Sequence, residues 1–248
     1  TFSKYYHPYN ITVANIVDDP KYKLGTFLSS DKYWASTRTG FSITYDTTDN
    51  YLTPTKGFLF APSASFYGLM GGYNKFTDGT LDLSNYLTLL KHKRLKWNLV
   101  WANHIAISTL TTLPGKDEIE LSTDYQLSFD GMRDLKGWGD YVGYDNYRGF
   151  SKVSLGSELR IPIPGTENLL WGALFFDGGK TWKETAFQNS RQMTALSEYL
   201  YSYGFGLKIE IPMFPIRFYF AKRLLWQNGW FREQDDKWQF VLSISGFF

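Results

Sequence analysis

Apolar and polar residues alternate with a period of two along most of this chain. Because successive side chains of a β-strand point to opposite faces, such a segment predicts a strand with one apolar and one polar face. The segment 169–182 is also predicted as a strand, although both of its faces are apolar. Ten strands are predicted in all, at 9–17, 35–47, 57–68, 81–91, 94–109, 151–163, 169–182, 203–212, 215–224 and 238–248.

The connections between these strands alternate in length. If each strand runs antiparallel to the one before it, every second connection lies at the same end of the sheet. One end then carries the long connections, whereas the other end carries mostly tight turns. This layout, with strands of about ten residues, is typical of an outer-membrane β-barrel. The long connections are 18–34, 69–80, 110–150, 183–202 and 225–237, the short ones are 92–93, 164–168 and 213–214, and 48–56 is of medium length.

The distribution of charged and aromatic residues favours the same fold class. Aromatic residues make up 19% of the 248 residues and lie mainly on the apolar faces, where they suit lipid and its interfaces. No run of 18 uncharged apolar residues exists, so no transmembrane helix is expected. A mean hydropathy of −0.31 still permits a membrane barrel, which exposes only alternate residues to lipid. The alternative is a soluble β-sandwich with its charges in bulk water. The predicted polar faces carry Arg38, Asp46, Lys152, Glu158, Arg160, Lys208, Glu210, Arg217 and Arg223.

The residues give little support to an enzyme or a nucleic-acid-binding protein. The net charge is +2 with interspersed charges, and the chain contains no cysteine. The three histidines, at positions 7, 92 and 104, are scattered and lie near no recognisable nucleophile motif. They also form no metal-ligand spacing. We therefore expect no catalytic residue, no metal, no cofactor and no nucleic-acid partner.

An ordered series of short motifs resembles the BamA-type outer-membrane protein insertases, the surface-antigen family. Each motif alone is unspecific, but six of them follow the family's order. The resemblance implies an all-β, antiparallel up-and-down transmembrane barrel of sixteen strands, of which about ten lie within 1–248. It also implies that the N-terminal strands and the periplasmic domains are missing here, because it starts near the family's seventh strand. The motifs are TYDTTDNYLTPTKGFLF (44–60), DGMRDLKGW (130–138), LGSELRIPIP (155–164), GALFFDGGKTW (172–182), YGFGLKIEIPMFPIRFYFA (203–221) and FVLSISGFF (240–248).

The resemblance makes 110–150 a long extracellular loop that folds into the lumen. DGMRDLKGW matches the tip of that loop, with Gly131 at its start and Gly137 and Trp138 at its end. The family places an arginine before the Gly–aromatic pair, whereas this chain has Lys136, which keeps the charge but loses the planar fork. Arg133 is the alternative source of the cation that enters the lumen.

The acidic partners of that cation match Glu158 and Asp177. Glu158 falls on a polar face by alternation. Asp177 shares its parity with Trp171 and Phe175, so a bulge near Gly178–Gly179 is one way to turn it inward.

The function implied by the resemblance is the assembly and insertion of β-barrel proteins in the outer membrane of Gram-negative bacteria. The barrel would open laterally beside its last strand, whose edge would template incoming strands. The implied partners are outer-membrane lipids, unfolded outer-membrane protein clients and accessory lipoproteins. The alternatives are a translocation pore of the TamA or two-partner-secretion type, and a passive porin or adhesin barrel. The residues expected along the terminal strand and its seam are Trp238, Phe240, Leu242, Ile244, Gly246 and Phe248.

Overall fold

The computed structural model of the chain is almost entirely β-structure. It describes residues 2–5, 34–72, 74–92, 97–115, 125–132, 134–139, 147–166, 169–183, 195–211 and 214–244. These residues form one antiparallel sheet of twelve strands, together with a 3-10 helix at Leu196–Glu198. No helix in the described ranges is long and apolar enough to cross a membrane.

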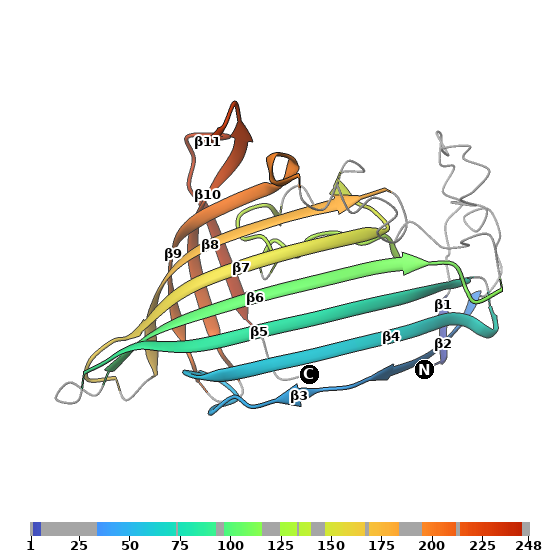
Figure 1. Cartoon of the computed structure of the whole chain (residues 1–248), viewed down its shortest axis with the longest axis horizontal. Helices are drawn as coiled ribbons and strands as arrows, with labels where there is room; N and C mark the ends of the chain where they lie inside the picture. The colour runs from blue at the N-terminus through green and yellow to red at the C-terminus, as the bar shows by residue number, and fades with distance from the viewer. Residues whose placement is uncertain are drawn as a thin grey trace.

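The strands follow one another in the sheet in chain order, which is the expected up-and-down topology. The long strands β4 to β8 run side by side, and the sheet curves round through β9 and β10 (Figure 1). β3 pairs with β4, while β11 and β12 pair with successive parts of β10. The strands are β1 (Phe2–Tyr5), β2 (Trp34–Ser42), β3 (Tyr45–Asp46), β4 (Gly57–Gly72), β5 (Phe76–His92), β6 (Trp97–Thr111), β7 (Ser151–Pro162), β8 (Leu170–Trp182), β9 (Leu200–Ile209), β10 (Ile216–Gln227), β11 (Trp230–Glu233) and β12 (Gln239–Ile244).

Several predicted boundaries need correction. The long connection predicted at 69–80 is wrong, because β4 continues to Gly72 and β5 begins at Phe76. In these extensions of β4 and β5 the strands remain paired, but many of the residues are polar or glycine. Alternation of hydrophobicity therefore does not identify the extensions as strand. The connection predicted at 225–237 likewise contains the end of β10 and all of β11. The strand predicted at 35–47 is split into β2 and β3, and the one predicted at 9–17 lies outside the described residues.

The two faces of the sheet differ in polarity, as the alternation predicts. On β8, Leu174 and Phe176 point outward and are 61% and 39% exposed, whereas Phe175 and Asp177 point inward and are buried. The inward row of β7 contains Lys152, Ser154, Gly156, Glu158 and Arg160, and cross-strand pairing places Gly156 opposite Asp177. Charged side chains therefore line the inner face, and aliphatic and aromatic side chains cover the outer face.

The bulge suggested near Gly178–Gly179 is not present. β7 and β8 pair without a register shift from Ser151↔Trp182 to Pro162↔Trp171, and β9 continues the same register on the other side of β8. Trp171, Phe175 and Asp177 share one parity on β8, and all three point inward. The assumption that large aromatic residues face outward is what misled the prediction.

Part of the connection between β6 and β7 packs against the inner face of the sheet. Phe129, Leu135 and Trp138 form a buried cluster, against which Leu200 of β9 and Leu225 of β10 are packed. The described part of this connection, in yellow-green, lies within the curve of the sheet in Figure 1. Residues 125–132 and 134–139 thus lie on the inner side of the sheet.

Candidate functional site

The loop tip is held to the wall by Lys136. Its ammonium Nζ lies 3.0 Å from Oδ2 and 3.3 Å from Oδ1 of Asp177, and its backbone N–H donates to the same carboxylate at 3.2 Å. The Asp177 side chain is only 2% exposed, so this is a buried ion pair. Side chain and backbone of one residue thus satisfy one carboxylate, which fixes both the position and the direction of the tip.

Two aromatic rings complete the site around the ammonium group. Lys136 Nζ lies 4.7 Å from the ring centre of Phe175 and 5.0 Å from that of Tyr219. The faces of such rings attract cations, and the attraction is stronger where water is excluded. Lys136 therefore makes the lumenal ion pair, with a ring from β8 and one from β10 beside it. Arg133, the alternative source of the cation, lies outside the described residues.

The two residues after Lys136 attach the tip to β9 and β10. Trp138 donates its indole N–H to the carbonyl of Tyr201 at 2.9 Å, and Arg223 donates its Nε–H to the carbonyl of Gly137 at 2.6 Å. Gly137 has a φ of +85°, and a Cβ there would lie 2.8 Å from the Cβ of Ala221 and 3.4 Å from that of Gln239. Only glycine fits this backbone without strain. The tip thus contacts β8, β9, β10 and β12.

The start of the tip is shaped by a close backbone approach. A Cβ on Gly131 would lie 2.2 Å from the Cα of Gly139, so the two ends of the tip nearly touch. Beside it, Lys152 of β7 binds the Asp134 carboxylate at 2.7 Å and the Ser128 carbonyl at 3.2 Å. A second ion pair therefore holds the loop against β7.

A separate ionic layer lies nearer the other end of the barrel wall. The contact predicted for Glu158 takes a different form, because its carboxylate pairs with Arg160 and, at 3.0 Å, with Lys208 of β9. Glu210 is buried as well, and its Oε1 lies 3.6 Å from Arg217 Nε and 3.9 Å from Lys208 Nζ. Glu158 is thus paired with wall residues, whereas the loop cation Lys136 is paired with Asp177.

The connection between β3 and β4, residues 47–56, packs against the inner face of the sheet at the end opposite the loop. Pro54 is buried, and the Thr88 hydroxyl donates to the carbonyl of Thr55 at 2.8 Å. The turn meets β7, β8 and β9, which are the third to fifth neighbours of β4 in the sheet. It therefore crosses the interior of the barrel. A space of about 10 Å³ is lined by Thr53, Pro54, Arg160, Trp171, Lys208 and Glu210.

Asp49 holds this turn in shape. Its carboxylate accepts hydrogen bonds from the Thr55 N–H at 2.8 Å, the Thr55 hydroxyl at 2.6 Å and the Lys56 N–H at 3.1 Å. Partial burial acts to raise the pKa of Asp49, but these hydrogen bonds outweigh it and lower the pKa below the ordinary value. The turn is thus stabilised by the ionised form of one side chain.

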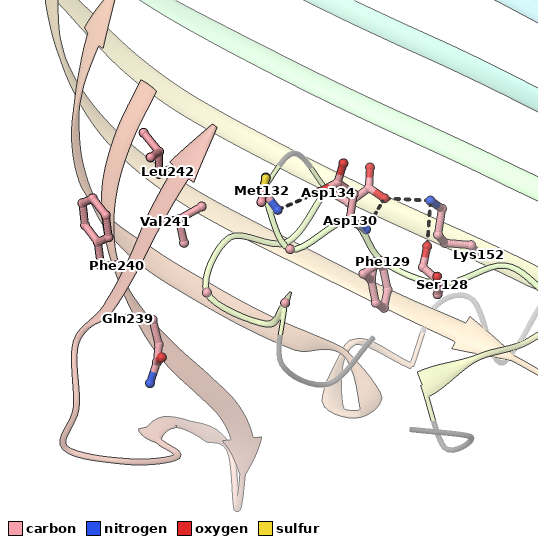
Figure 2. Close-up of a pocket in the computed structure, with 13 residues that line it drawn as sticks. Ser128, Phe129, Asp130, Met132, Asp134, Lys152, Gln239, Phe240, Val241 and Leu242 are labelled. Atoms are coloured by element: carbon pink, nitrogen blue, oxygen red, sulfur yellow. Dashed lines mark hydrogen bonds and ion pairs between the residues drawn. The ribbon is translucent and has the colours of Figure 1, made fainter. Parts of the chain in front are cut away.

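The terminal strand β12 lies beside the loop tip. Val241 points toward the loop, whereas Phe240 points away from it (Figure 2). A cavity of about 680 Å³ separates the loop from β12 and is bordered by Met132, Asp134, Lys152, Val241 and Leu242, among others. The tip therefore supports the strand at Gln239 and leaves open space beyond it.

The seam residues fall on both sides of the described boundary. Phe240, Leu242 and Ile244 face outward from β12, and Trp238 precedes the strand and packs against Phe205 with ring centres 5.5 Å apart. Gly246 and Phe248 lie outside the described residues. Among the residues that the structure describes, β12 pairs only with β10.

This arrangement of wall and loop can be compared with known proteins. The family model described as the Omp85 superfamily domain matches residues 3–246, almost the whole chain. The chain belongs to the Omp85 superfamily. Among solved structures, it is similar to BamA from Haemophilus ducreyi lacking POTRA domains 1–3, with a TM-score of 0.62 and 20% sequence identity. The similarity covers 90% of this chain and 45% of that one, so the chain spans less than half of that BamA chain. A search of curated sequences found no match.

Two features of this Omp85 barrel were missed by sequence reasoning. Arg223 was placed on the polar face, but nothing in its neighbourhood marked it as a partner of Gly137, which lies 86 positions away. The turn at 47–56 was treated as an ordinary connection. Its Asp, Pro and Gly residues signalled a tight turn, but the sequence contains no sign of which wall the turn would meet.

The described residues of the Omp85 lumen supply hydrogen bonds and charges. They contain no arrangement of side chains suited to metal binding. No group of three or more His, Asp or Glu side chains there is placed to hold an ion. His104 lies 3.6 Å from Asp82 on the inner face, with no third acidic or histidine partner in such a group. What the site can do is brace the wall and present the edge of β12.

Proposed function

We propose that this chain is the barrel portion of an outer-membrane protein insertase, which assembles β-barrel proteins in the outer membrane of Gram-negative bacteria. Membership of the Omp85 superfamily supports an insertase or a translocator of that membrane. The observation that carries the narrower proposal is the unequal support of the terminal strand. β12 is braced from inside by the loop tip at Gln239, while a cavity separates the loop from the following residues Val241 and Leu242.

An unpaired strand edge in lipid is a strong template for another strand. Its N–H and C=O groups find no hydrogen-bond partner among acyl chains, so pairing with an incoming strand satisfies both partners. The cavity behind β12 leaves room for inward-facing side chains of that strand. The protein would therefore act without covalent chemistry, cofactor or nucleotide. Its partners would be unfolded outer-membrane proteins, outer-membrane lipids and accessory lipoproteins.

The interior of the barrel argues against a passive porin. The loop tip occupies the lumen beside β8 to β10, and the turn at 47–56 crosses it near the opposite end. A translocation pore of the TamA or two-partner-secretion type would need both obstacles to move. An insertase needs only the seam to yield, which is why we favour it.

The test is a reconstitution of the complete protein in liposomes with a urea-unfolded eight-stranded outer-membrane protein. We expect the client to insert faster than into empty liposomes and to gain the heat-modifiable mobility of a folded barrel. A photo-crosslinker at Leu242 should capture the client during insertion, and one at Leu174, on β8, should not. Recovery of the client inside the liposomes as soluble protein would support the translocator instead. Equal insertion with and without the protein would contradict both.

A further inference from the structure

A row of polar side chains crosses the apolar outer face of the sheet. Asn85 of β5 pairs across the strands with Asn103 of β6, which in turn pairs with Ser157 of β7. All three have the outward parity of their strands and are half-buried. Each is flanked along its strand by apolar outward residues, namely Leu83 and Leu87 on β5, Trp101 and Ile105 on β6, and Leu155 and Leu159 on β7.

The row lies at the centre of the lipid-facing band. On β6 the outward apolar residues run from Leu99 to Ile107, and Asn103 is the middle position. On β5 they run from Leu81 to Leu87 and, after a register shift between Thr88 and Leu90, continue at Leu90, so that Asn85 lies within the run. Polar side chains at that depth are costly in contact with acyl chains, which offer no hydrogen bonds.

The row satisfies only part of its own hydrogen-bonding capacity. The Trp101 indole N–H donates to the Ser157 hydroxyl at 2.8 Å, and that hydroxyl donates to the Asn103 side-chain oxygen at 3.0 Å. The amide N–H groups of Asn103 and the whole amide of Asn85 have no hydrogen-bond partner among the described residues. They remain available to a partner at the same depth.

We propose that the outer face of β5 to β7 is the contact surface for a second copy of this chain in the membrane. A two-fold axis along the membrane normal keeps every residue at its own depth, so the row of one copy meets the row of the other. An asparagine amide both donates and accepts, and two such rows are therefore complementary to each other. Polar side chains of this kind hold transmembrane segments together in lipid.

The surroundings of the row suit such a contact. Trp101 and Ile105 are each 39% exposed beside Asn103, and Leu87 and Leu159 extend the apolar surface on either side. β8, β9 and β10 separate this surface from β12 in the sheet. A dimer formed here would therefore leave the terminal strand edge accessible, and the two copies could work independently.

Cysteine cross-linking in native outer membranes tests the contact, because the chain contains no cysteine of its own. Ile105→Cys places a thiol next to Asn103, and Leu207→Cys on β9 is a matched control, since the two residues are 39% and 37% exposed. We expect oxidation to give a disulfide-linked dimer of the Ile105→Cys protein and little of the control. Adding Asn85→Leu and Asn103→Leu to Ile105→Cys should lower the yield by about tenfold.

Three results would overturn the proposal. They are equal cross-linking at positions 105 and 207, a yield that the leucine substitutions leave unchanged, and an adduct that mass spectrometry identifies as a different protein. Heat-modifiable mobility of each variant shows that its barrel is folded, so an absent dimer also counts against the contact.

Discussion

The loop tip and the terminal strand are adjacent, yet they are held in opposite ways. Residues 135–138 are buried, and their polar groups bond to β8, β9 and β10. β12 has six residues, and a cavity lies between the loop and its residues Val241 and Leu242. Stabilising contacts are therefore concentrated in the wall that the loop braces, and the neighbouring strand is left easy to displace. The lateral opening that we propose would need this inequality.

Of the substitutions that we propose, removal of Lys136 should have the largest effect on the stability of the wall that the loop braces. Lys136→Ala leaves the Asp177 carboxylate buried without its cation, and breaking a buried pair in this way costs about 3–5 kcal/mol. We expect the free energy of unfolding in detergent to fall by that amount and the temperature of the heat-modifiable gel transition to fall with it. Met132→Ala, at an exposed position of the same tip, is the control and should change neither.

A paired substitution separates the ion pair from the packing. Lys136→Met with Asp177→Leu removes both charges and keeps apolar side chains in their place, so it should be less destabilising than Lys136→Ala. If the double variant were the less stable of the two, the buried carboxylate would not be the cause of the loss.

Substitution of the glycine next to it should loosen the contact between the two regions. In Gly137→Ala, the new methyl group collides with Ala221 and approaches Gln239, and overpacking of this kind costs about 1–3 kcal/mol. Gly115→Ala is a matched control, because its φ is +74° but no atom lies within 4 Å of the added Cβ. The difference between the two unfolding free energies measures the clash alone, and equal values would mean that the tip does not rest on β10 and β12.

Hydrogen exchange should show the inequality in the unmodified protein. We expect the amides of residues 239–244 to exchange at least about tenfold faster than those of β8, because β12 has only six residues and borders a cavity, whereas β8 is paired with both neighbours over most of its length. Mass spectrometry of the protein in nanodiscs measures both segments in one experiment. Equal protection of β8 and β12 would contradict the difference in support between the braced wall and the terminal strand.

The smallest expected effect concerns the turn at 47–56, away from both regions. Hydrogen bonds lower the pKa of Asp49 in the folded protein. The ionised carboxylate therefore contributes fully to the stability of the turn above the unfolded pKa of about 3.9, and this contribution is lost as the pH falls through the lower folded pKa. Planar-bilayer recordings should show channel openings becoming more frequent as the pH falls below about 3.9. Asp49→Ala should show frequent openings already at neutral pH, and an unchanged trace would mean that the turn does not close the lumen.

The sequence predicts the sheet better than it predicts the contacts across the barrel. Alternation places Glu158 and Arg160 on the inner face because it reports local strand geometry. It misses the ends of β4 and β5, where strands continue beyond the apolar band and hydrophobicity no longer alternates. It leaves the direction of Asp177 uncertain, because it assigns Trp171 and Phe175 to lipid although these rings pack inside against the loop and the turn.

Contacts between distant segments could not be predicted in the same way. Whether Lys136 pairs with Asp177 or with Glu158 depends on how far the loop extends into the lumen. No local sequence pattern predicts that distance. The family resemblance narrowed the choice to a few residues. The three-dimensional arrangement then selects Asp177, with its rings from Phe175 and Tyr219.

The turn that crosses the base also has a consequence for the order in which the barrel folds. Residues 53–54 meet a cavity wall that includes Lys208 and Glu210, which follow more than 150 positions later in the chain. The turn is made early during synthesis, but its docking site does not exist until β9 is in place. Contacts between such distant positions form slowly. We therefore expect closure of the base to be among the last steps of folding, after most of the wall is complete.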